Sequence, residues 1–165
     1  MRLIQSDEPL PNPVDRIELI AGENDWAFER SGLDEITLSV TGGMADYQVS
    51  FSWMPQMEAI HLAAAFDLRV AVAREIEVMR LIALINAQMW MGHFDLWRDA
   101  GLMMFRHTLL LAGGPPATNE QIAALLGAAT TACDRYYQAF QFVIWAGRTA
   151  AESLQSVLFE TVGEA

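Results

Sequence analysis

The stretch that decides the fold runs from Ile36 to Phe66, ITLSVTGGMADYQVSFSWMPQMEAIHLAAAF. Three runs in it alternate apolar with polar or small residues, and Gly42-Gly43 and Pro55-Gln56 separate the runs. Side chains at a period of two line one face of a strand, and glycine or proline pairs between such runs favour turns. The stretch therefore predicts an antiparallel meander with one buried face. That face is formed by Ile36, Leu38, Val40, Tyr47, Val49, Phe51, Trp53, Ile60, Leu62, Ala64 and Phe66.

Helical patterns lie on both sides of this meander. Asn12 is the expected N-cap of a first helix that ends between Gly22 and Asn24, and a short strand is expected over residues 26–30. From Val72 to about Met91 the apolar residues return at helical spacing, which predicts a second helix closed by Gly92. The order of helix, strands and helix indicates an α+β fold.

A hairpin and two helices complete the chain. Strands are expected over residues 93–98 and 102–111, forming a second ribbon whose symmetric pairing about Ala100 would put His93 opposite His107. Thr118 with Gln121 is a capping box that begins a long third helix, and Thr149 with Glu152 begins a short last one.

Composition restricts the function classes. The formal net charge is −11 and no lysine is present, which disfavours nucleic acid as a ligand. The single cysteine, Cys133, cannot form an internal disulfide, and we see neither a signal peptide nor an apolar run long enough to cross a membrane. We expect a soluble cytoplasmic protein with an extended tail over residues 1–11 and one domain over residues 12–165.

Patterns typical of catalysis are missing from the sequence. We find no HExxH, no paired CxxC, no GxSxG and no phosphate-binding loop, so we predict no catalytic residues, no metal and no cofactor. One alternative stays open, because His93 and His107 with Arg106 could line a small-molecule or metal pocket near the hairpin.

Apolar residues make up 53% of the chain, more than one small core easily covers. The aromatic residues of the third helix point in more than one direction, so part of them could form a dimer interface or a groove for a partner. The alternative for every one of these residues is a place in the core. The predicted partner-binding residues are Trp90, His93, Phe94, Trp97, Arg106, Tyr137, Phe140 and Trp145.

Three passages resemble the YbjN family of bacterial proteins. They are residues 84–94 (LINAQMWMGHF), Phe105-Arg106-His107, and residues 136–145 (YYQAFQFVIW) followed by Gly147. The resemblance extends over about residues 13–165. It implies a fold like that of type III secretion chaperones, a twisted antiparallel sheet with flanking helices, commonly dimeric, and a regulatory or chaperone-like role without enzymatic activity.

Two hypotheses follow. The first is a homodimeric interaction module that binds a segment of an unidentified client or regulatory protein through an apolar sheet or helix surface. The second is a regulator that binds a small molecule or a metal near His93, Arg106 and His107.

Overall fold

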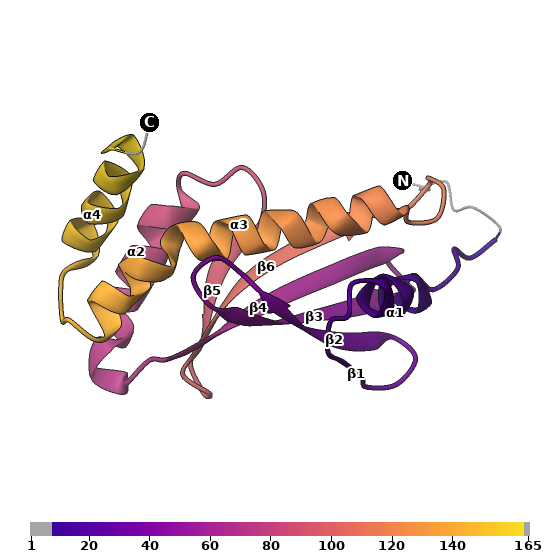
Figure 1. Cartoon of the computed structure of the whole chain (residues 1–165), viewed down its shortest axis with the longest axis horizontal. Coiled ribbons are helices and arrows are strands. Elements are labelled where there is room, and N and C mark those ends of the chain that lie inside the picture. Colours follow the sequence, from indigo (N-terminus) through magenta and orange to yellow (C-terminus); the bar gives the residue numbers. More distant parts are fainter. Residues whose placement is uncertain (1–7, 164–165) are drawn as a thin grey trace, which may run out of the picture.

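The computed structural model of the protein describes residues 8–163, with side chains described up to Phe159. In this range it contains one six-stranded antiparallel sheet, in the order β1-β2-β3-β4-β6-β5. Helices α1 and α3 lie on one face of the sheet, and α2 and α4 pack together beyond its β5 end (Figure 1). The predicted fold class, an α+β fold with a twisted antiparallel sheet and flanking helices, is confirmed. Residues 1–7 of the predicted tail lie outside the described residues.

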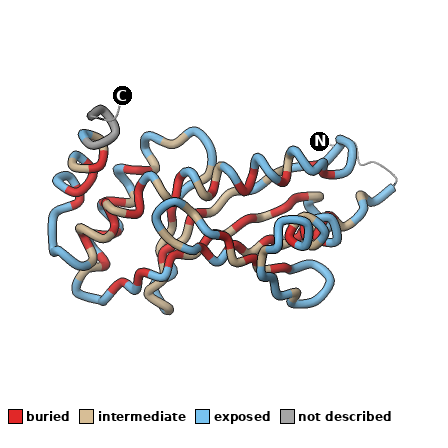
Figure 2. Tube along the Cα trace, in the orientation of Figure 1, coloured by how far each residue is buried: buried red, intermediate tan, exposed pale blue. Residues whose placement is uncertain are grey.

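The first four strands form the predicted meander. They are β1 (Phe28–Arg30), β2 (Glu35–Thr41), β3 (Asp46–Met54) and β4 (Ala59–Arg69), each antiparallel to the next. Burial alternates along β2 and β3, and the eleven apolar positions expected to share one face are all buried. Buried residues lie on the sheet and on α3, and each of the other helices, α1, α2 and α4, also has a buried side (Figure 2).

The last two strands, β5 (His93–Trp97) and β6 (Leu102–Leu110), do not form a separate ribbon. β6 pairs with β4, so the hairpin extends the same sheet and β5 becomes its edge. The helix between β4 and β5 is also shorter than expected: a 3₁₀ turn, η1 (Val72–Arg74), precedes α2 (Glu75–Asn86). The predicted end near Met91 is wrong, because residues 87–89 form successive turns after Asn86.

The outer helices have the predicted local signals. α1 spans Val14–Glu23 with Pro13 at its N-cap, one residue after the expected Asn12, whose Oδ1 accepts the Val14 N–H at 2.9 Å. α3 (Asn119–Ile144) begins with the expected capping box between Thr118 and Gln121. α4 (Ala150–Gly163) begins with the reciprocal bonds between Thr149 and Glu152.

Two charged side chains at the start of α2 fix the junction of α3 and α4. The Arg74 guanidinium donates to Val143 O at 2.9 Å, at the C-terminal end of α3. Glu77 Oε1 accepts the Ala150 N–H at 2.7 Å, at the N-terminal end of α4. Each charge therefore complements the helix dipole that it meets. The Ala150 N–H, with help from Arg80, holds the pKa of the Glu77 carboxyl below its usual value.

Candidate protein-binding surfaces

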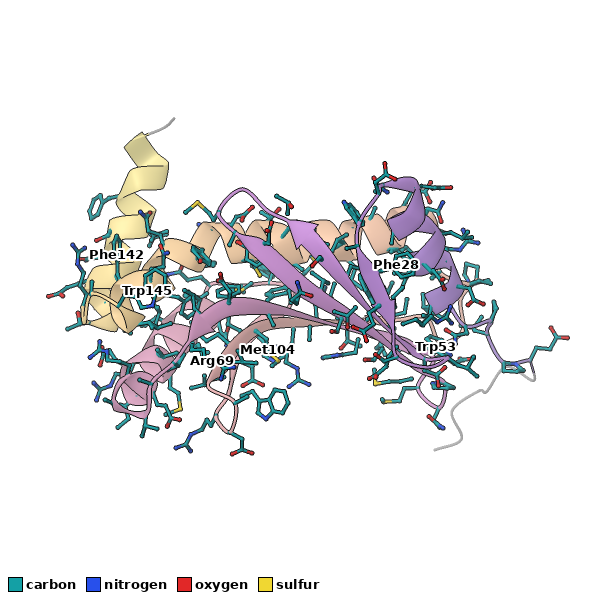
Figure 3. The ribbon with its side chains drawn as sticks, turned by 60° about the horizontal axis from the view of Figure 1, so that its bottom comes forward. Phe28, Trp53, Arg69, Met104, Phe142 and Trp145 are labelled. Atoms are coloured by element: carbon teal, nitrogen blue, oxygen red, sulfur yellow. The ribbon has the colours of Figure 1, made fainter. Side chains whose placement is uncertain are left out.

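The eight predicted partner-binding residues fall into three groups. Phe94, Tyr137 and Phe140 are buried, so their prediction as surface residues is wrong. Trp90, Trp97 and Trp145 are 99%, 55% and 67% exposed, and His93 is exposed as well. Arg106 is half-buried within a small polar network. Trp145 lies at the end of the molecule formed by α3 and α4, beside Phe142 (Figure 3).

The packing of the aromatic residues against the sheet explains why α3 contains so many of them. Tyr137 packs against Phe66 of β4 with ring centroids 5.7 Å apart, while Tyr136 packs against Phe94 of β5 at 5.8 Å. Phe140 contacts both Phe66 and Phe94. Neighbouring side chains on a helix point about 100° apart, and here both directions meet aromatic residues of the twisted sheet.

Arg106 has the partner that a charge in an alternating strand requires. On the sheet face away from α1 and α3, its Nη1 donates to Asp95 Oδ2 at 3.0 Å and its Nε donates to His61 Nε2 at 3.2 Å. Partial burial lowers the pKa of His61, and the charges of Arg106 and His93 lower it further. His61 is thus a neutral acceptor for Arg106 near neutral pH. The network joins β4, β6 and β5.

His107 does not join this network. His93 pairs with Arg106, one position away from the predicted pairing, and His107 pairs with the buried Leu62. Since directly paired residues share a face, His107 lies on the helix-covered face and His93 on the open one. The small-molecule or metal pocket inferred from these histidines is therefore not assembled. Within residues 8–163 no group of three or more metal-ligating side chains gathers.

The open face is polar over β2 and β3. Thr37 Oγ1 and Ser50 Oγ are 2.8 Å apart, and Gln48 Nε2 donates to Ser39 Oγ at 2.6 Å. Met104 and Arg69 lie on the β4 and β6 part of the sheet in the view of Figure 3. The β2 and β3 part of this face thus offers mainly hydrogen-bonding groups, so the apolar sheet surface of our first hypothesis is not what this part presents.

Asn86 and Phe94, which lie in the passage that resembles the YbjN family (residues 84–94), are joined by hydrogen bonds. Asn86 Nδ2 donates to Phe94 O at 3.0 Å, and Asn86 Oδ1 accepts the Phe94 N–H at 2.8 Å. One side chain thereby satisfies the outward backbone groups of the edge strand, as a neighbouring strand would. The Leu96 N–H is taken by Asp95 Oδ1. Strand addition at the β5 edge is consequently blocked by the chain itself.

We expect Asn86→Ala to lower the free energy of unfolding by about 2 kcal/mol, since it leaves a largely buried donor and acceptor without partners. Urea denaturation followed by tryptophan fluorescence measures the loss. Asn24→Ala is the matched control, because Asn24 lies on the surface and makes one such bond, to Ile20 O. A loss no larger than the control's would show that Asn86 does not hold the edge strand.

Helix α2 has a second apolar face that sequence analysis missed. Val78, Leu81 and Ile85 are buried, whereas the opposite side carries the exposed Ile76, and Val72 is exposed in the preceding 3₁₀ turn η1. Met79 continues this side at 39% exposure and is followed by the exposed Ala83. We call these residues, together with Val72 of η1, the outer face of α2 (Val72, Ile76, Met79 and Ala83). The spacing of i, i+4, i+7 and i+11 was readable in the sequence. It was hidden there because the inner and outer stripes overlap into one apolar run.

Similarity to known proteins extends over most of the chain. The model of the YbjN family, described as "Putative bacterial sensory transduction regulator", matches residues 13–142. The crystal structure of YbjN, "a putative transcription regulator from E. coli", is similar in fold, with a TM-score of 0.51 and 15% sequence identity. The match covers 94% of this chain and 96% of that one. Comparison with curated proteins gives no match. Among the described residues, no helix combines the length and apolarity needed to span a membrane. Because the family model covers most of the sequence, the chain belongs to the YbjN family.

Proposed function

We propose that this protein is a non-enzymatic regulator that works by binding another polypeptide, in a chaperone-like manner, and that two copies associate through the outer face of α2. The observation that carries the proposal is the apolar character of this outer face, where Val72 and Ile76 are 84% and 63% exposed. Apolar side chains gathered on one exposed helix face typically mark a binding surface. The description of the family as sensory transduction regulators agrees with such a role.

A second copy suits the outer face of α2 on grounds of charge. The whole chain has a formal net charge of −11, so copies repel each other over most of their surfaces. Residues 72–91 carry two arginines and two glutamates and are neutral. Glu75 is paired with Arg98 and Glu77 with Arg80. The helix can therefore meet its own copy without a net electrostatic penalty.

The only cysteine supports a role without enzymatic chemistry. Cys133 is fully buried in α3, and burial raises the pKa of its thiol far above neutrality. A thiol that remains protonated and out of contact with solvent is a poor nucleophile. Its place among apolar residues makes it part of the core.

We expect the wild-type chain to be a dimer in sedimentation velocity and the double substitution Ile76→Glu with Met79→Glu to be a monomer. Four glutamates would then face one another across the symmetric interface. Leu33→Glu is the control, since Leu33 is more exposed than Ile76 and Met79 but lies in the loop before β2, and it should stay dimeric. A monomeric wild type, or a double variant that still dimerises with an unchanged melting temperature, would overturn the proposal.

A further inference from the structure

A groove runs between α1 and α3, on the side of the molecule away from the open sheet face. One part of it, of about 350 Å³, lies between α1 and the residues that lead into α3. Another, of about 440 Å³, continues between α3 and the turn after β2. Ile20 lines both parts. From Asn119 to Asp134 the groove follows α3 for about 22 Å, the length of four helical turns.

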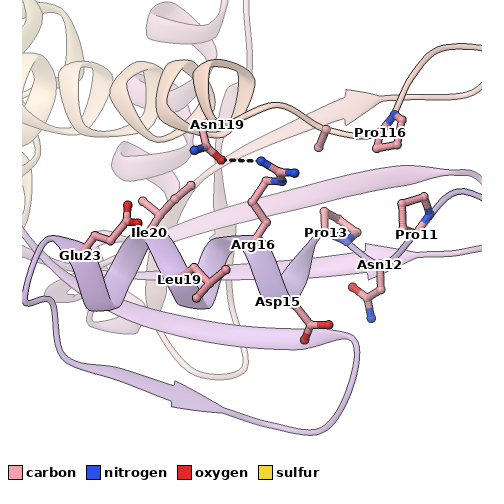
Figure 4. Close-up of a pocket in the computed structure, with 11 residues that line it drawn as sticks. Pro11, Asn12, Pro13, Asp15, Arg16, Leu19, Ile20, Glu23, Pro116 and Asn119 are labelled. Atoms are coloured by element: carbon pink, nitrogen blue, oxygen red, sulfur yellow. Dashed lines mark hydrogen bonds between the residues drawn. The ribbon is translucent and has the colours of Figure 1, made fainter.

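The floor of the groove is apolar. Ile122 and Leu126 of α3 and Val40 of β2 line it from the core side, and Trp26 is only partly covered. On α1, Arg16, Ile20 and Glu23 lie on the side that faces α3 (Figure 4). Leu19, 69% exposed, adds an apolar side chain to the rim.

The α3 wall is made of small residues. Ala123, Gly127 and Thr130 line it. A Cβ atom built on Gly127 would meet nothing within 4 Å, so the wall has open space in front of it. Small residues on a helix allow the backbone of a second helix to approach closely. Together with the apolar floor, this wall fits an incoming helical segment.

The charge of the groove specifies what that segment carries. Asp15, Glu23 and Asp134 line it, and Arg16, which donates to Asn119 Oδ1 at 2.8 Å, is the cation among the lining residues. Asp15 is paired with Arg30, and Asp134 accepts the N–H groups of Gly43 and Met44, so Glu23 is the carboxylate left available to a partner. Residues 1–66 contain eleven acids and three arginines, a net charge of −8, whereas residues 67–165 contribute only −3. The α1 and β2 sides of the groove therefore belong to the strongly acidic part of the sequence.

Glu23 is informative because its position does not serve stability. It is the last residue of α1, where the helix dipole favours a cation, and no basic residue occupies that last turn. Glu23 is exposed, and its side chain makes no hydrogen bond or ion pair with any residue of the described range 8–163. Its carboxylate lines the groove and is available to a cation supplied by a partner.

We infer that the groove between α1 and α3 binds an amphipathic helical segment of another protein, with apolar residues against Ile122 and Leu126 and Lys or Arg residues against the acidic rim. A second copy of this acidic chain lacks the required charge. The inference depends on the proposed protein-binding role but concerns a surface other than the outer face of α2, so the two can fail separately.

The test uses the full-length protein and a labelled synthetic helix of about 15 residues, with leucines on one face and lysines on the other. Fluorescence anisotropy measures its affinity. Gly127→Leu places a side chain in the groove while improving helix propensity. We expect it to weaken binding at least about tenfold without lowering the melting temperature. Ala124→Leu, exposed on α3 outside the groove lining, is the matched control and should bind as wild type does.

A charge substitution and a change of salt concentration provide the second part of the binding test. Glu23→Arg removes an acid from the groove and places a cation at the end of α1, so we expect weaker binding, about threefold or more, with an unchanged or higher melting temperature. Binding by the wild type should weaken as NaCl is raised. The same peptide with glutamates in place of lysines should not bind.

Equal binding to wild type, Gly127→Leu and Glu23→Arg, equal binding of the acidic peptide, or no binding at all would overturn the inference. Binding that appears only after residues 1–7 are removed would assign the groove to the chain's own N-terminal segment and also overturn it. The dimer of the wild type and its loss in the Ile76→Glu and Met79→Glu variant test the proposed function independently of these results.

Discussion

Gly92→Ala is expected to lower the free energy of unfolding by about 3 kcal/mol. Gly92 has φ +70°, a conformation that costs a residue with a Cβ about 1 to 2 kcal/mol. Its added Cβ would also overlap the Phe105 ring and come within 2.9 Å of Arg106 O. Both neighbours belong to β6, which is paired on both sides by β4 and β5, and overpacking there costs a further 1 to 3 kcal/mol or so.

Gly113→Ala separates the two contributions. Gly113 has φ +77°, close to that of Gly92, but a Cβ there would meet nothing within 4 Å. Urea denaturation of both variants should therefore give a loss of about 1 kcal/mol for Gly113→Ala, and the difference between the variants measures the overlap with Phe105. Equal losses would show that the strand relaxes around the new methyl group.

The passage that relates the chain to its family thus acts mainly on the fold. Asn86 closes the edge of β5, Gly92 lets the chain pass over Phe105, and Phe94 fills the core. Only His93 of the Gly-His-Phe triplet is exposed to solvent. The resemblance therefore identified the architecture correctly, while most residues that carried it are unavailable to a partner.

Periodicity predicted β2, β3 and β4 well, because one face of each is buried and its apolar positions leave a clear alternation. It could not predict that β6 pairs with β4, since that contact joins residues about 45 positions apart and depends on the crossover through α2. A sequence pattern reports which face of a strand is apolar. It does not report which strand lies beside it.

The predicted register of the β5-β6 hairpin was also wrong, and this error put His93 and His107 together in a site that does not exist. The turn between Trp97 and Leu102 contains four residues, with Gly101 at φ +62°, so pairing is symmetric about the Asp99–Ala100 bond instead of Ala100. A shift of one residue in the pairing moves every side chain of the shifted strand to the opposite face. His107 therefore lies on the helix-covered face, and the pair proposed with His93 does not form.

Candidate binding surfaces were harder to predict than the fold, because exposure depends on tertiary packing. The groove between α1 and α3 combines residues from Pro11 to Asp134 and has no local pattern. The ring-rich end of α3 gave a strong local signal that mostly described the core. Of its five aromatic residues, Tyr136, Tyr137 and Phe140 are buried, whereas Phe142 is half-buried and Trp145 is exposed.

Phe140→Ala is expected to lower the free energy of unfolding by about 4 kcal/mol, whereas Trp145→Ala should change it by less than about 0.5 kcal/mol. Phe140 is fully buried, and its ring centroid lies 5.3 Å from that of Phe94 and 5.7 Å from that of Phe66. Removing it leaves a cavity where three elements meet. Trp145, at the C-terminal end of α3, has most of its surface in solvent.

The two substitutions also separate stability from partner binding. Chemical denaturation gives the free energies, and Phe140→Leu, which refills most of the cavity, should recover more than half of the loss. Any loss of association in Phe140→Ala would then follow from unfolding, so it could not assign the residue to an interface. Because Trp145→Ala keeps the fold, reduced association in that variant would place Trp145 in a binding surface. A large loss of stability in Trp145→Ala would mean that its ring is covered in solution.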